Sequence, residues 1–477
     1  MKFRTLFAVP YAVLLVAAAM PSHVFAQNDL TKSAHHKHPS YQLVDMGTLG
    51  GSEVTLSFAA HILNNTGMFG GQCDTSVTDP YYPNFNPFIY PFPKTIAQHA
   101  CLYRDGAMTD LGDSASPQNS GVSLLNNLGH AVGVAENGTI DPLTGYPEVG
   151  AVLWKDGSAI PLGNLGGNET LSVAINDHDQ IAGFAANAVP DPLSFFGWGT
   201  QMRAFFWEKG VMHDIGTLGG PDAFAGYINN RGQVAGVSYT SSDANPDTGI
   251  PTLDPFLWQD GKMRDLGSLG GTLNFTNGMN NRGQVIGEAY LPGDVESRPA
   301  LWSNGVALDL GTFGGSNGAA NWINVRGDVV GGSNLPGDEK HHAFLWRNGF
   351  FRDLGVLPGD KCSTAWSINS KGQIVGASGL CGIAVHAFLW QDGEMIDLNR
   401  LVPPGVQLTY AVDINDHGVI ACLGRTSGHE EHDLRVFLLV PGDSDQDAHA
   451  KVRGEQPMSR AARLLRDLRS RGGVRGD

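Results

Sequence analysis

Basic residues are scarce in this chain of 477 residues. It has 31 Lys and Arg against 47 Asp and Glu, and only 16% of its residues are charged. Proteins that bind nucleic acid neutralise phosphates with clustered Lys and Arg, whereas an acidic surface repels the phosphate backbone. The composition therefore predicts no nucleic-acid partner.

Long apolar runs are absent beyond the N-terminus. The one such run, residues 6–20, follows two basic residues, is interrupted by Pro10, and precedes small residues that end at Ala26. It is shorter than the roughly 20 residues of a membrane-spanning helix. The pattern predicts a cleaved signal peptide over residues 1–26, no transmembrane segment, and an exported protein, secreted or periplasmic. The mature chain then has 29 basic and 47 acidic residues and a formal charge of −18.

Recognisable catalytic motifs are also missing. The chain has no GxSxG elbow, no Walker loop and no HExxH helix. Residues 176–180 and 443–447 resemble calcium loops, but they lack the turn glycine and the terminal glutamate. The histidines at 35, 36 and 38 lie in residues 27–40, a segment typical of a solvated linker. The sequence therefore predicts no catalytic residue, no metal ligand and no cofactor.

Cysteine is rare, with five residues, and their spacing forms no C-x-x-C pair of the kind that binds zinc. Disulfides persist in exported proteins, so we expect two. Cys362 and Cys381 flank a predicted hairpin turn, and a hairpin centred midway would place them directly opposite. Cys73 and Cys101 bracket a Pro- and aromatic-rich segment and can staple its base. Cys422 has no obvious partner and is expected to be a buried free thiol.

Glycine, by contrast, is abundant, with 63 residues, and it punctuates a repeat. Three phrases recur eight times in a fixed order. The first is an apolar run such as AFLW, which ends at Tyr103, Trp154, Trp207, Trp258, Trp302, Trp346, Trp390 and Leu439. The second, DLG, begins at Asp45, Asp110, Pro161, Asp214, Asp265, Asp309, Asp353 and Asp397. The third, IN followed by a turn and a QVVG-like run, has its Asn at 64, 126, 176, 229, 280, 324, 369 and 415.

Each phrase is typical of a strand or a tight turn. The AFLW and QVVG runs are short, apolar and rich in β-branched or aromatic residues, as buried strands are. Turn sequences such as QDGK and NNRG supply the Asn, Asp and Gly that tolerate positive φ. Four strands, AFLW, xMxDLG, SxAxxIN and QVVG, in about 45 residues indicate one blade of a β-propeller.

The ends of the repeat indicate how the fold closes. The chain enters at Tyr41 with a DLG-type phrase and leaves near Pro441 with an apolar run, so the two fragments complete one unit. We predict an all-β propeller over residues 41–442, with eight four-stranded blades closed by pairing of the terminal strands. Seven blades plus an irregular N-terminal unit is the alternative, and a β-solenoid is a third. We favour SxAxxIN as the innermost strand, because small residues suit a crowded axis.

The three phrases together resemble the HAF family of probable extracellular repeats, named from the His-Ala-Phe that begins here at His342 and His386. The similarity covers roughly residues 41–441. The resemblance implies an exported bacterial repeat protein. It implies no particular activity and no set of catalytic residues.

Residues present in nearly every unit are expected to serve the scaffold. The Asn of IN suits hydrogen bonds to backbone N–H groups of the following turn, and the Asp of DLG, absent only at Pro161, is expected to act similarly. A ring of eight ion sites is the functional alternative for these polar groups. The tryptophans that end the apolar runs are expected to pack between blades.

Variation is concentrated between QVVG and the next AFLW, so these connections elaborate one face of the propeller, here named the elaborated face. Two insertions, residues 78–94 and 191–202, are rich in aromatic residues, which can stack on sugars or anchor a protein partner. The alternative is that they fold down over apolar scaffold. The candidate ligand-binding residues are Tyr81, Tyr82, Phe85, Phe88, Tyr90, Phe92, Phe195, Phe196 and Trp198.

Residues 443–477 differ from the repeat. The stretch 459–471 places leucines on one helical face and arginines around the rest. A short basic amphipathic helix here can contact an anionic surface or dock on the acidic propeller. A frayed, solvated tail is the alternative.

These observations support three hypotheses about function. The first is an exported, non-catalytic binding module for a glycan or protein ligand on the elaborated face. The second is a carbohydrate-active lyase or hydrolase at the mouth of a central channel, which requires a convergent acid and base or a metal. The third is a purely structural surface protein.

Overall fold

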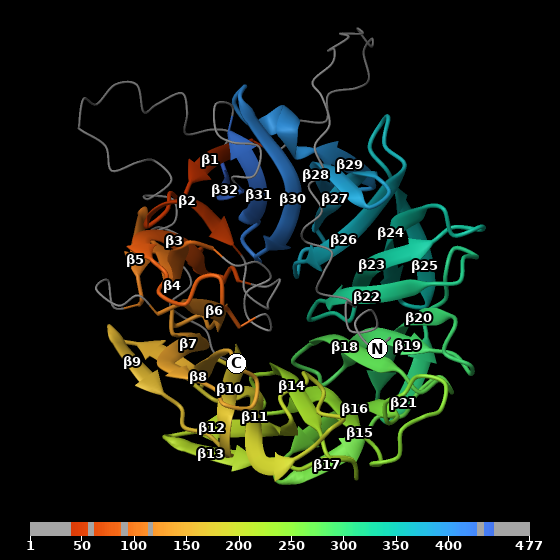
Figure 1. Cartoon of the computed structure of the whole chain (residues 1–477). Coiled ribbons are helices and arrows are strands. Elements are labelled where there is room, and N and C mark those ends of the chain that lie inside the picture. The colour runs from red at the N-terminus through yellow and green to blue at the C-terminus, as the bar shows by residue number, and fades with distance from the viewer. Residues whose placement is uncertain (1–39, 56–61, 87–93, 113–117, 427–433, 443–477) are drawn as a thin grey trace, which may run out of the picture.

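The computed structural model describes residues 40–55, 62–86, 94–112, 118–426 and 434–442. Within them, eight four-stranded antiparallel sheets stand in a ring and form an eight-bladed β-propeller (Figure 1). The predicted eight blades are confirmed, and the seven-blade and solenoid alternatives are excluded. The predicted signal peptide, residues 27–39 of the linker and the tail 443–477 lie outside the described residues. No helix in the described part of the chain is long and apolar enough to cross a membrane.

The first four blades follow one another along the chain. Blade 1 comprises β2 (Gly50–Thr55), β3 (Phe69–Thr78), β4 (Ile96–Arg104) and β5 (Ala107–Asp110). Blade 2 comprises β6 (Ser120–Leu125), β7 (Ala131–Ile140), β8 (Pro147–Lys155) and β9 (Ser158–Pro161). Blade 3 comprises β10 (Gly166–Ile175), β11 (Ile181–Pro190), β12 (Thr200–Glu208) and β13 (Val211–Asp214). Blade 4 comprises β14 (Ala223–Ile228), β15 (Val234–Tyr239), β16 (Leu253–Gln259) and β17 (Lys262–Asp265).

The other four blades complete the ring. Blade 5 comprises β18 (Asn274–Met279), β19 (Val285–Tyr290), β20 (Ser297–Ser303) and β21 (Val306–Asp309). Blade 6 comprises β22 (Gly318–Ile323), β23 (Val329–Asn334), β24 (His341–Arg347) and β25 (Phe350–Gly355). Blade 7 comprises β26 (Cys362–Ile368), β27 (Ile374–Leu380), β28 (Ile383–Gln391) and β29 (Glu394–Asp397), followed by the 3-10 helix η2 (Leu398–Leu401). Blade 8 comprises β30 (Val406–Ile414), β31 (Ile420–Thr426), β32 (Arg435–Pro441) and β1 (Tyr41–Asp45).

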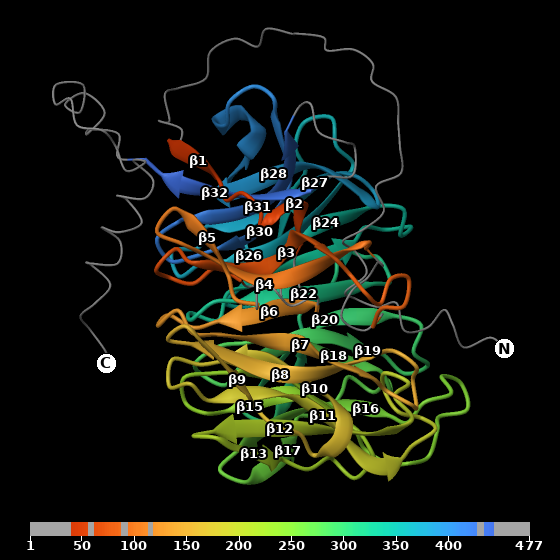
Figure 2. The ribbon, with the colours of Figure 1, turned by 60° about the vertical axis from the view of Figure 1, so that its left-hand side comes forward.

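The SxAxxIN strands lie innermost, as expected from their small residues. From β6 to β30, each of these strands contacts the same strand of the next blade, and Figure 1 shows them nearest the axis. The N-terminal strand β1 pairs with β32 and is therefore the outer strand of blade 8, and Figure 2 shows the two lying side by side. The predicted closure is confirmed, and it leaves β32 with a partner on both edges.

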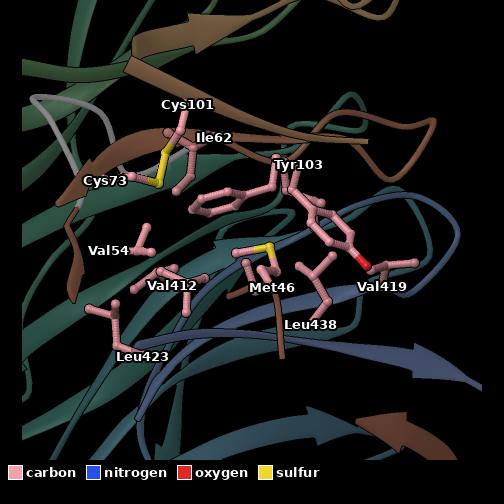
Figure 3. Close-up of a cluster of buried hydrophobic side chains, with 14 of the residues drawn as sticks. Met46, Val54, Ile62, Cys73, Cys101, Tyr103, Val412, Val419, Leu423 and Leu438 are labelled. Atoms are coloured by element: carbon pink, nitrogen blue, oxygen red, sulfur yellow. A yellow bond between two sulfur atoms is a disulfide. The ribbon is translucent and has the colours of Figure 1, made fainter. Parts of the chain in front are cut away.

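A hydrophobic cluster seals the junction between blade 8 and blade 1. Val412 and Leu438 of blade 8 pack with Val54 and the Cys73–Cys101 disulfide of blade 1 (Figure 3). The tryptophans that end the apolar runs behave in the same way at other junctions. Trp154 of blade 2 packs with Leu102 of blade 1, and Trp390 packs in a cluster shared by blades 6 and 7. Each blade thus buries its faces against its neighbours, as the repeat predicts.

In blades 2 to 7 the glycine that ends the QVVG-like run is required by a close approach of backbone, whereas blade 8 has Cys422 at this position. A Cβ at Gly376 would lie 2.1 Å from the carbonyl oxygen of Thr364 on the neighbouring inner strand. A Cβ at Gly236 would lie 1.9 Å from the oxygen of Phe224. In both blades the inner strand has a register shift just beyond this contact, which is the mark of a β-bulge.

The repeated Asp of DLG has two partners. Asp353 Oδ1 accepts a hydrogen bond from the N–H of Gly355 at 2.7 Å, so the predicted capping of backbone donors is confirmed. The same carboxylate pairs with His342, the first residue of HAF, at 3.0 Å. Arg203 and Asp214 form the equivalent pair in blade 3. In blade 2 the equivalent positions are Gly150 and Pro161, so both partners are replaced together.

Candidate functional site

Three loops of the elaborated face begin with an Asp-Pro dipeptide. Asp79, Asp141 and Asp191 start the connections β3–β4, β7–β8 and β11–β12. Asp79 accepts a hydrogen bond from the N–H of Tyr81 at 2.8 Å, and Asp141 and Asp191 accept the equivalent bond at 2.9 and 2.8 Å. A side-chain oxygen that accepts an N–H two residues later defines an Asx turn, and the proline fixes φ inside it. The three loops therefore leave their blades in the same direction.

A polar side chain of the next blade lies behind each of these loops. Asn119, Glu169 and Asp222 occupy equivalent positions at the start of an inner strand, and each is at most 4% exposed. Each accepts a hydrogen bond from the third strand of the preceding blade. The donors are the N–H of Gln98 at 2.8 Å, of Val149 at 3.1 Å and of Met202 at 2.8 Å, respectively. Their first role is therefore to join adjacent blades, and we name them junction residues.

Burial perturbs the acidic members of this group strongly. Burial is the main cause that raises the pKa of Glu169 to about 8. The hydrogen bond from the N–H of Val149 partly opposes this rise, and the negative charge of the nearby Asp141 adds to it. Burial also raises the pKa of Asp222 and the pKa of Glu136, each to about 7. Glu136 accepts hydrogen bonds from the backbone N–H and the side-chain amide of Asn119. At neutral pH the carboxyl of Glu169 is therefore mostly protonated and neutral.

A pocket with a volume of about 230 Å³ opens between the second Asp-Pro loop and blade 3. Asp141 and Asn168 line one part of it, Asn187 and Trp198 another, and Glu169 is also among its lining residues. Glu169 is 1% exposed, and its Oε1 has no hydrogen-bond partner among the described residues. A buried polar atom without a partner is uncommon in proteins and is costly unless a ligand or water satisfies it. This atom makes the pocket the candidate binding site.

Asp141 has a different role from Glu169 within the pocket. Its Oδ1 accepts from the N–H of Leu143 and from Asn168, and its Oδ2 accepts from the hydroxyl of Thr144 at 3.1 Å. Its hydrogen-bonding capacity is thus used to hold the loop. Among the described residues, the pocket therefore contains one protonated acid, Glu169. Its other carboxylate, Asp141, is held by hydrogen bonds from Leu143, Thr144 and Asn168.

The aromatic residues proposed from the sequence divide into three groups. Tyr82 is 49% exposed on the first loop, and Tyr81 is half-buried. Phe85, Phe195 and Phe196 pack against a hydrophobic cluster that joins blades 2 and 3. Phe88, Tyr90 and Phe92 lie outside the described residues.

Trp198 requires a correction. It is 2% exposed, and its ring lies 5.6 Å from that of Phe184 in the core, so its aromatic face is used in packing. It forms part of the pocket wall and is not an exposed stacking platform. For the second loop, the structure thus favours the alternative in which aromatic residues cover apolar scaffold. The reason is that Phe184, the large residue that precedes Ala185 in β11, presents a ring on which the loop can fold.

Both predicted disulfides form. Cys73 bonds to Cys101 and staples β3 to β4 below the first loop, and Cys362 bonds to Cys381. The prediction that Cys362 and Cys381 lie directly opposite each other in the hairpin was wrong. Cys362 lies opposite Gly379, and Cys381 lies in the turn beyond β27. A bulge in β26 causes this offset from a symmetrical hairpin. Cys422 is a buried free cysteine, as expected.

Sequence reasoning missed the junction residues and therefore the pocket. Glu169 comes from β10 and Asp141 from a loop of blade 2, and only the packing of the two blades brings them together. A signal was present in the recurrence of Asp-Pro at residues 79, 141 and 191. Because the same dipeptide opens three successive insertions, it marks a loop geometry shared by these blades.

Comparisons with known proteins give no closer assignment. No family model and no curated protein sequence matches the chain. Among solved structures, the acylaminoacyl peptidase of Pyrococcus horikoshii aligns at 11% identity and a TM-score of 0.42, covering 80% of this chain and 58% of the peptidase. The β-propeller domain of the trilobed protease from Pyrococcus furiosus aligns at 8% identity and 0.41, covering 72% and 95%. A Trypanosoma rangeli sialidase aligns at 9% identity and 0.33, covering 84% and 57%. At TM-scores this low, none of these likenesses bears on the activity of this chain.

Proposed function

We propose that this chain is an exported binding module of the HAF type that recognises a neutral glycan through the pocket between blades 2 and 3. The observation that carries the proposal is the buried, unpartnered Oε1 of Glu169, a residue that lines that pocket. A protonated carboxyl both donates and accepts hydrogen bonds, as a sugar hydroxyl does. The disulfides and the resemblance of the repeats support the exported setting.

The composition of the pocket supports a neutral ligand. The polar residues that line it are Asn168, Asn187, Thr200, Asp141 and Glu169. None of the described residues that line it is Lys or Arg, so a uronate or sulfate group would meet negative charge without a counterion. Its volume lies below the about 300 Å³ of ordinary ligand pockets, which suits one sugar ring at a chain end.

Binding explains the pocket better than catalysis does. A glycosidase of either stereochemical type needs two carboxyls that flank the scissile bond, and the hydrogen bonds of Asp141 commit it to its own turn. Glu169 alone can hold a hydroxyl group and cannot supply both roles. We therefore propose recognition without turnover.

The test is titration of the mature chain, residues 27–477, with neutral and acidic oligosaccharides by calorimetry. Ala188 lines the pocket from the exposed end of β11, so Ala188→Trp should obstruct the pocket and weaken binding at least tenfold. Val189→Trp is the matched control, because Val189 is the next residue, is 48% exposed and lies outside the pocket lining. We expect it to bind as the wild type does.

Two outcomes would contradict the proposal. Saturable binding that Ala188→Trp leaves unchanged would place the ligand elsewhere on the chain. Release of shorter oligosaccharides during the titration would show an enzyme. Glu169→Gln separates the role of the carboxyl, because the amide keeps an acceptor for the N–H of Val149 and donates at every pH. This variant should bind with an affinity that no longer falls above pH 8.

A further inference from the structure

The Cys362–Cys381 disulfide lies beside a histidine of the neighbouring blade. His341 begins β24 of blade 6, whereas both cysteines belong to blade 7. A ring nitrogen of His341 and the two sulfur atoms all lie within 4.8 Å of one another. The three residues lie about 20 residues apart in the sequence, so they do not form a short metal-binding motif.

The same junction departs from the pattern of the others at two positions. Where Asn119 and Asp222 accept a backbone N–H with an oxygen, Cys362 accepts the N–H of His341 with its sulfur at 3.3 Å. The donor position holds Gln98 in blade 1 and Met202 in blade 3, and it holds a histidine in blade 6. Two metal-binding residue types therefore replace the usual pair at one junction. Neither replacement is needed to join the blades, because oxygen acceptors do so elsewhere.

The two disulfides also differ in their accessibility to a reductant. Cys381 is exposed in the two-residue turn between β27 and β28, beside Gly382, while Cys362 is 2% exposed. Cys73 and Cys101 are both 0% exposed. Thiol–disulfide exchange requires that a thiolate reach one sulfur in line with the bond. A dissolved dithiol therefore reaches Cys381 first and leaves Cys73–Cys101 intact.

We infer that reduction of Cys362–Cys381 creates a site for a thiophilic metal ion such as Zn²⁺, with His341, Cys362 and Cys381 as ligands. The dithiol donates two electrons and two protons, the S–S bond breaks to give two thiols, and the dithiol becomes a disulfide. Binding of Zn²⁺ then displaces the two thiol protons to solvent. Zn–S bonds of about 2.3 Å place tetrahedral ligand atoms about 3.7 Å apart, a separation that the turn at Cys381 can provide by a small movement.

The site has three protein ligands and one open position. That arrangement is typical of zinc that exchanges a ligand, and structural zinc sites use four protein ligands instead. His341 belongs to blade 6, and the two sulfur atoms belong to blade 7. Reduction and zinc binding therefore replace the disulfide within blade 7 by metal–ligand bonds that connect blades 6 and 7. The oxidised protein has no such site, since both sulfurs are engaged in their own bond.

The experiment measures zinc binding by the mature chain before and after mild reduction with a dithiol, which is then removed under anaerobic conditions. Competition with a chromophoric chelator should show one equivalent of Zn²⁺ bound by the reduced protein and none by the oxidised protein. His341→Ala leaves the disulfide intact and should weaken zinc binding at least tenfold. His342→Ala is the matched control, because the neighbouring histidine pairs with Asp353 and lies outside the cluster.

Two results would overturn the inference. One is a reduced protein, folded by circular dichroism, that binds no stoichiometric zinc. The other is equal binding by Cys381→Ser, which would assign the metal to the remaining cysteines. Cobalt substitution gives an independent readout, because a thiolate-to-cobalt charge-transfer band should appear in the reduced wild type and be lost in Cys381→Ser.

Discussion

Asn415 donates a hydrogen bond from its Nδ2 to the backbone carbonyl oxygen of Asn64 at 3.0 Å, across 351 residues of sequence. This bond completes a ring in which every repeated asparagine donates to the carbonyl of its counterpart in the next blade. The other seven bonds, of 2.9 to 3.1 Å, join Asn64 to Asn126, Asn176, Asn229, Asn280, Asn324, Asn369 and Asn415 in turn. The side-chain oxygens of these asparagines accept backbone N–H groups of their own turns, as Asn64 does from Met68 and Asn415 from Val419, which argues against a ring of ion sites.

The ring predicts a large cost for Asn415→Ala. The side-chain oxygen of Asn415 also accepts the N–H groups of His417 and Val419 at 3.0 Å, so the substitution removes the partner of one partly buried donor and one buried donor. We expect the free energy of unfolding to fall by about 3 kcal/mol in urea titrations. Asn281→Ala is the control, since that exposed side chain accepts one bond from Asn230, and it should cost less than about 1 kcal/mol. Equal losses in the two variants would contradict a special role for the ring.

The buried carboxyls predict that stability falls as pH rises. Glu169 has a pKa of about 8 in the folded protein against the ordinary 4.5 of a glutamate carboxyl, so the folded state binds more protons between these pH values. The free energy of unfolding therefore decreases as pH rises from about 5 to 9, and Glu136 and Asp222 act in the same direction up to about pH 7. Glu169→Gln removes one of these titrations and should be more stable than the wild type at pH 9 by on the order of 2 kcal/mol. Denaturant titrations across this range measure the slope, and the exposed substitution Glu394→Gln should leave it unchanged.

Blade 4 carries two acids where every other blade except blade 2 carries a basic residue and an acid. Asp254 occupies the position of His342 and Arg203, and it faces Asp265 of the DLG phrase. Burial and then Asp265 raise the pKa of Asp254 to about 6. Asp254→Arg should restore the pair and raise stability at pH 8 by up to about 1 kcal/mol, with a smaller gain at pH 5 where Asp254 is already protonated. A thermal melt of both proteins at both pH values tests this, and a gain independent of pH would refute the electrostatic explanation.

The glycine that ends the QVVG-like run in blades 2 to 7 predicts a steric effect that composition alone does not. Gly376→Ala places a Cβ against the Thr364 carbonyl and should lower the free energy of unfolding by about 3 kcal/mol. Gly150→Ala, whose new Cβ would meet nothing closer than 3.9 Å, should change stability by less than about 1 kcal/mol. Equilibrium denaturation of the two variants distinguishes them, and similar values would show that the inner strand yields to accommodate a methyl group.

The number of blades, their four strands and their closure follow from the amino-acid sequence alone, because each blade is built from local phrases with a strand period and turn residues of positive φ. Asp392 and Gly393, for example, have φ of 54° and 89° in the turn that the DG dipeptide predicts. The disulfide partners also followed from spacing within single hairpins. The strands, turns and disulfide partners are local features, and the phrases of the repeat recur in a fixed order. Such features can therefore be predicted from the order of residues in the sequence.

Which side chains meet between the blades depends, by contrast, on tertiary packing. Trp198 and Tyr82 have the same aromatic character in the sequence, yet Trp198 is 2% exposed and Tyr82 is 49% exposed, because Phe184 offers a packing surface to one loop. Glu169 meets Asp141, and His341 meets Cys362 and Cys381, only where two blades pack side by side. Such contacts depend on which side chains face a junction and how deeply they are buried, and neither property is periodic in the sequence.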